Sequence, residues 1–153
     1  MLTQEERAEV LETFLERHTA VEWKHVRRGE AQEPAGLFEH TFTRLTSRPY
    51  GELRVQVALR GDGDVDVHFF VAGHKPDWIE QVFVVPEGNE REALEEAAEF
   101  VGSFVREQTV LAYDPTFFAG GRVFLRADAV SPEQRKKLSW IVSWCGTHDW
   151  HRP

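Results

Sequence analysis

The chain has 153 residues, of which 41% are hydrophobic and 12% aromatic, and its formal net charge is −8. This composition excludes a largely disordered chain and favours a single domain over residues 1–153. The acidic balance argues against nucleic-acid binding, which needs a basic face. No apolar run approaches the ~20 residues that cross a bilayer. The acidic N-terminus lacks a secretory signal, and one cysteine allows no internal disulfide, so we expect a cytoplasmic protein.

Two amphipathic helices are predicted from capping signals that precede apolar stripes. A capping box at Thr3 comes before a helix over about 4–18, and a second one at Asn89 comes before a longer helix over about 90–108. In both segments apolar residues recur every three or four positions, which is the spacing of a helix with one core-facing side.

The strongest strand signal is a hairpin over residues 52–71. Apolar and polar residues alternate on both sides of the Gly- and Asp-rich turn 61–64, as expected for an antiparallel pair with one buried face. Further strands are predicted over 20–26, 37–45, 78–85 and 110–113. Together these elements predict an α+β domain: an antiparallel sheet of about five to seven strands with two or three helices packed on one face.

The last third of the chain is harder to assign. Residues 117–125 read as two strand arms around a Gly-Gly turn, and Ser131-Pro132 starts a third helix. Residues 139–145 either continue that helix up to Gly146 or form a last strand rich in Ile, Val and Trp. We favour the helix.

The negative charge is concentrated in the two long predicted helices. Segment 5–17 has a net charge of −3 and segment 87–107 a net charge of −5, which together equal the −8 of the whole chain. Several glutamates stand four residues apart, and each such like-charge pair costs roughly 0.2–0.5 kcal/mol on an exposed helix. By helical spacing Gly102 lies on the same outer face, where it would allow the close approach of another chain.

An acidic helical face that is costly to maintain indicates a binding surface. We therefore expect a non-catalytic protein-binding module of the inhibitor, immunity, chaperone or adaptor type, without a cofactor. Its partner would be another protein with a basic surface, and a homodimer is an alternative. The predicted partner-binding residues are Glu12, Glu16, Glu92, Glu95, Glu96 and Glu99.

The alternative is a thiol- or zinc-dependent enzyme. Cys145, His148, Asp149 and His151 lie within seven residues, and all are of types that ligate zinc. An imidazole beside Cys145 could also stabilise a thiolate nucleophile. Against this, a lone cysteine on an apolar stripe is usually a small buried hydrophobe.

Other polar and aromatic groups give weaker signals. His68, His74, Asp77 and Glu80 match no metal-site spacing, so we interpret them as surface residues. A third hypothesis is a small-ligand pocket between the long helix and the sheet. The five tryptophans, which we expect to fill the core, are Trp23, Trp78, Trp140, Trp144 and Trp150. The alternative is that Trp144 and Trp150 lie on an exposed binding surface.

Overall fold

The computed structural model describes residues 1–20, 23–26, 36–43, 52–60, 62–71, 78–116, 122–144, 148 and 150–152. The chain divides into two compact units, Met1–Gly102 and Ser103–Pro153. Each unit combines helix with antiparallel sheet, so the α+β class is confirmed. Among the described residues, no helix has both the length and the apolar character needed to cross a membrane. That residues 1–153 form one domain stays a prediction.

The first unit contains a five-stranded meander in which each strand pairs antiparallel with the next. Its strands are β1 (Lys24–Val26), β2 (Gly36–Thr43), β3 (Glu52–Leu59), β4 (Val65–Val71) and β5 (Trp78–Phe83). The predicted central hairpin is confirmed, because Leu59 pairs with Val65 next to the turn and Leu53 pairs with Val71 at the far end.

The hairpin has one fully buried face and one half-exposed face. The buried side chains are Val55, Val57 and Leu59 on β3 and Val65, Val67 and Phe69 on β4. The residues between them, including Arg54, Gln56, Asp66 and His68, are half-exposed. Because side chains alternate along a strand, a slip of one residue would expose the whole apolar set, so burial fixes the register.

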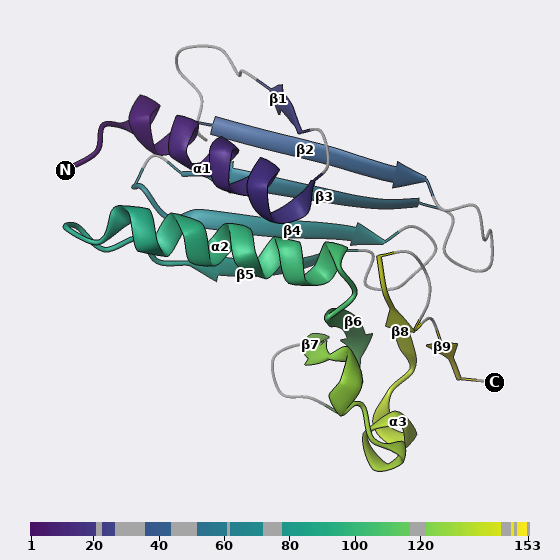
Figure 1. The fold of residues 1–153 in the computed structure, drawn as a ribbon. Coiled ribbons are helices and arrows are strands. Elements are labelled where there is room, and N and C mark those ends of the chain that lie inside the picture. Colours follow the sequence, from purple (N-terminus) through teal and green to yellow (C-terminus); the bar gives the residue numbers. More distant parts are fainter. Residues whose placement is uncertain are drawn as a thin grey trace. The chain divides into compact units, whose positions relative to one another are not determined.

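Two helices, α1 (Gln4–Thr19) and α2 (Glu90–Val105), lie side by side across the same face of this sheet and run in the same direction (Figure 1). Phe100 of α2 packs against the buried side, with its ring centroid 6.1 Å from that of Phe69 and 5.3 Å from that of Phe83. Aromatic rings therefore fill this interface, which counts against a ligand pocket between the long helix and the sheet. The buried helical residues include Leu11, Phe14, Leu15, Leu94, Ala97, Ala98 and Val101.

A buried arginine ties both helices to the central hairpin. Arg7 of α1 donates from Nη1 to the carbonyl oxygen of Gly63 in the β3–β4 turn, at 3.4 Å. Its Nη2 lies 3.6 Å from Oε1 of Glu90, the first residue of α2. Gly63 has a φ of +96°, and a Cβ built there would collide with the Arg7 guanidinium. The turn thus needs glycine for its backbone and for the space that Arg7 occupies.

The second unit has a separate four-stranded sheet in the order β7-β6-β8-β9. Its elements are β6 (Thr109–Tyr113), β7 (Arg122–Arg126), α3 (Pro132–Lys137), β8 (Trp140–Val142) and β9 (Trp150–His151). The prediction of one sheet of five to seven strands is therefore wrong. Alternation along a strand predicts a buried face but carries no information about which strand pairs with which, and α2 separates the two sets along the chain.

The preference for helix over residues 139–145 is also wrong. The third helix starts at the predicted Ser131 capping box but ends at Lys137, because Leu138 is extended with φ −87° and ψ 144°. Residues 140–142 pair with β6 as strand β8. All three are buried, and their aromatic and β-branched side chains suit a buried strand. Strand β7 pairs with β6, and the predicted hairpin arm over 117–119 lies outside the described residues.

Replacing Gly63 with alanine should destabilise the first unit more than the same change at Gly88. Both glycines have positive φ, so each substitution costs about 1–2 kcal/mol in the backbone. A Cβ at Gly88 meets nothing within 4 Å. At Gly63 it displaces Arg7, and the lost buried hydrogen bond should add about 1–3 kcal/mol. Urea unfolding measures both, and equal losses would contradict the role given to Arg7.

Replacing Glu90 with glutamine should remove stability at neutral pH but not in acid. Hydrogen bonds from backbone N–H groups lower the pKa of the Glu90 carboxyl in the folded chain, and the largest effect comes from the N–H of Glu90 itself. Its contribution is therefore present above the unfolded pKa of about 4.3 and is lost as pH falls through the lower folded value. Urea midpoints of wild type and variant should converge on acidification. Glu87→Gln, an exposed position in the preceding turn, is the control, and a difference independent of pH would contradict the assignment.

Candidate functional site: an acidic helical surface

The predicted acidic face is present on the sides of α1 and α2 that point away from the buried stripes. We call it the acidic helical surface, and it comprises Glu9, Glu12, Glu16, Glu92, Glu95, Glu96 and Glu99. Glu12 and Glu95 are half-exposed and the others are exposed, whereas the exposed cations of these two helices are Arg17 and Arg91. A shallow hollow of ≈ 250 Å³ joins the two helices, with Glu9 and Arg17 from α1 and Arg91 from α2 in its lining.

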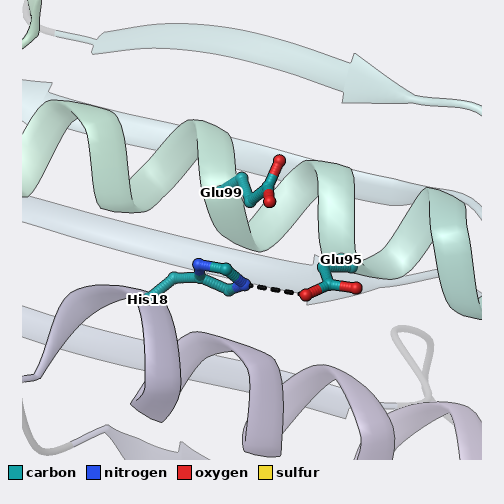
Figure 2. A group of neighbouring side chains, drawn as sticks. All are labelled: His18, Glu95 and Glu99. Carbon is teal, nitrogen blue, oxygen red and sulfur yellow. Dashed lines mark hydrogen bonds and ion pairs between the residues drawn. The ribbon is translucent and has the colours of Figure 1, made fainter.

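One glutamate of this surface is committed to an internal contact. Glu95 Oε1 lies 3.1 Å from Nε2 of His18 on α1 (Figure 2). The same oxygen lies 3.6 Å from Nη1 of Arg17, also on α1. Glu99, one turn further along α2, completes a group whose potential ligand atoms lie within 4.8 Å of one another. Sequence reasoning missed His18 because it is 77 residues from Glu95 in the chain. Glu95 therefore holds α1 and α2 together.

The remaining carboxylates of the surface are uncompensated. None of the six forms an ion pair with any other residue that the structure describes; they are Glu9, Glu12, Glu16, Glu92, Glu96 and Glu99. Glu92 and Glu96 are four residues apart and repel each other, as the sequence predicted. The surface therefore carries a negative potential that extends about one Debye length, roughly 8–10 Å, into solvent at physiological salt.

Gly102 does not belong to this surface. The sequence predicted it on the outer side of the helix, but the structure shows it buried. The three steps from Glu99 to Gly102 turn the helix by roughly 300°, which leaves Gly102 about 60° round the helix from Glu99, towards the packed side. Gly102 therefore gives no support for the close approach of a second chain.

The C-terminal cluster is only partly described. His148 is exposed, and its backbone N–H donates to Oγ of Ser143 at 2.9 Å. Cys145 and Asp149 lie outside the described residues, and His151 is placed only by its backbone in β9. The thiol- or zinc-dependent alternative therefore stays a prediction.

Three of the five tryptophans fill the core, namely Trp23, Trp140 and Trp144. The hypothesis that Trp144 lies on an exposed binding surface is therefore wrong, because its side chain is buried. Trp150, one of the two candidates for a binding surface, is half-buried and lines an open hollow of ≈ 670 Å³ in the second unit. Arg135 stands 5.8 Å over its ring, and Lys136 and Arg152 also line this hollow. The cations make it unsuited to a basic partner. The side chain of Trp78 is not among those described.

A second group of metal-ligand types lies on the half-exposed face of the five-stranded sheet. His68 and Glu80, read from the sequence as surface residues, stand directly opposite each other on β4 and β5. Asp66 joins them, with all three potential ligand atoms within 4.8 Å of one another. Burial raises the pKa of the Asp66 carboxyl, Arg60 opposes this, and the Glu80 carboxylate adds to it. His74 and Asp77 lie outside the described residues.

Comparisons with protein-family models, curated proteins and solved structures find no match to this chain.

Replacing Glu95 with glutamine should lower stability slightly, whereas Glu96→Gln should leave it unchanged or raise it. Glu95 loses an ion pair with Arg17 worth about 0.2–1 kcal/mol, while Glu96 loses only repulsion from neighbouring carboxylates. The difference between the variants should shrink in 1 M salt, because salt screens exposed charges. Thermal unfolding at low and high salt measures this difference in stability. A larger loss for Glu96→Gln would contradict the cross-helix role of Glu95.

Proposed function

We propose that this protein is a non-catalytic binding module whose acidic helical surface holds a partner with a basic surface. The observation that carries the proposal is the set of exposed glutamates on two adjacent helices that form no ion pair with other described residues. Such an arrangement costs folding energy through repulsion, and a chain that used glutamate only for solubility could alternate it with lysine.

The geometry supports fast and selective association with a cationic partner. The two helices lie against a packed sheet, so their outer carboxylates are held on a firm support and lose little backbone freedom on binding. A surface with one sign of charge attracts an oppositely charged partner before contact and repels acidic proteins. An inhibitor, immunity protein, chaperone or adaptor would use both effects.

Partner and location belong to the same proposal. The partner is a basic protein, with a second copy of the chain as the alternative that a dimer would reveal. A cytoplasmic location is proposed from the single cysteine, which allows no internal disulfide. The exposed carboxylates repel a nucleic-acid backbone, so the proposal includes no nucleic-acid partner.

Reversing Glu92, Glu96 and Glu99 to lysine should weaken the complex by at least about tenfold at physiological salt, because three attractions become repulsions. Glu95 is left intact so that the contact between α1 and α2 survives. The partner is first recovered from the protein's own cell lysate at low salt and identified by native mass spectrometry. Its Kd for wild type and variant is then measured over a range of salt concentrations, and the wild-type affinity should fall steeply as salt rises.

The matched control reverses three exposed acids elsewhere, Glu87, Asp128 and Glu133, which changes the net charge by the same amount. This control should retain most of the wild-type affinity. Equal weakening by both triple variants would mean that only the overall charge matters, and an unchanged Kd in the helical variant would end the proposal. Circular dichroism establishes that both variants are folded.

A further inference from the structure

The sheet face opposite the helices carries three metal-ligand types in a geometry set by strand pairing. Asp66 and His68 are two residues apart on β4, so their side chains leave the sheet on the same side. That side is opposite Phe69, whose ring contacts α2. Glu80 on β5 is the register partner of His68, with Oε1 3.7 Å from the imidazole Nε2. Hydrogen-bonded strands therefore hold all three groups with little freedom to separate.

The arginine that pairs with Asp66 is held loosely and is shared with a third acid. Oδ1 of Asp66 is inaccessible to solvent and accepts no hydrogen bond from the described residues. Arg60 Nη1 lies 3.7 Å away, which is beyond hydrogen-bond distance. Arg60 also pairs with the exposed Asp62 at 2.9 Å. The half-buried Asp66 and the exposed Glu80 repel each other beside one imidazole, and a cation between them would remove that cost.

We propose that Asp66, His68 and Glu80 form a binding site for a divalent transition-metal ion of the zinc class. An imidazole nitrogen and carboxylate oxygens are ordinary zinc ligands, whereas calcium and magnesium take oxygen ligands. An ion 2.0–2.2 Å from three such atoms needs them roughly 3.3–3.6 Å apart, so the 3.7 Å between His68 and Glu80 requires only a small adjustment. Three protein ligands leave a fourth position open to water or an external ligand.

The group His18, Glu95 and Glu99 is the weaker candidate and serves as the internal control. Its imidazole already lies at hydrogen-bond distance from Glu95, and Arg17 competes for the same carboxylate oxygen. Glu99 is exposed on the outer side of a helix. A metal ion there would compete with two contacts to one carboxylate oxygen, whereas on the sheet face Arg60 and His68 pair with different carboxylates, each at the longer distance of 3.7 Å.

The test is a titration of the full, chelator-treated chain with Zn²⁺, followed by calorimetry, and with Co²⁺, followed by visible absorption. Wild type should bind one ion per chain. His68→Ala, and the isosteric changes Asp66→Asn and Glu80→Gln, should each weaken binding by more than about tenfold. His18→Ala and Cys145→Ala should leave it unchanged, and the Co²⁺ spectrum should contain no thiolate charge-transfer band. Urea unfolding checks that each variant retains the fold.

Several results would overturn the proposal. One is that wild type binds no ion. Another is that it binds several ions weakly and that His68→Ala does not change this binding. A third is that His18→Ala or Cys145→Ala abolishes binding. The last result would move the metal to the helices or to the C-terminal cluster. The site does not depend on the acidic helical surface, so the partner experiment and the metal titration can fail separately.

Discussion

The burial of one face of the β3–β4 hairpin is the constraint on which the first unit depends. Six aliphatic and aromatic side chains on that face are inaccessible to solvent, and each gains about 1.5–3 kcal/mol from burial. Only the observed register keeps all of them inside. The same register determines that α1 and α2 cover this face and that Asp66, His68 and Glu80 come together on the other one.

The same packing gives each of the two helices a buried apolar side and a solvent-facing acidic side. Their apolar stripes are buried against the sheet, and their glutamate-rich sides face solvent. Arg7 and Glu95 are the exceptions that join the elements: Arg7 reaches the hairpin turn and the start of α2, and Glu95 reaches back to α1. Charged contacts inside the unit therefore join the helices to each other and to the hairpin, and the other glutamates of the acidic helical surface face solvent.

The sequence predicted secondary structure correctly where the signal comes from neighbouring residues in the chain. The capping box at Thr3, the alternation over the hairpin and the helix start at Ser131 all depend on residues within a few positions of one another, and all three are confirmed. It failed at Trp140–Val142, where burial beside β6 outweighs the continuation of a short helix, and at Gly102, where extrapolation by helical spacing placed a buried residue outside.

The sequence by itself determined the α+β class, the start and type of most elements, and the placement of negative charge on two helices, because periodicity and composition act over short distances along the chain. Only the tertiary structure decided that the strands form two sheets, that His18 meets Glu95, and that Asp66 joins His68 and Glu80. The contacts of His18 with Glu95 and of His68 with Glu80 join different elements, and they follow from strand order and helix packing, which no local pattern encodes.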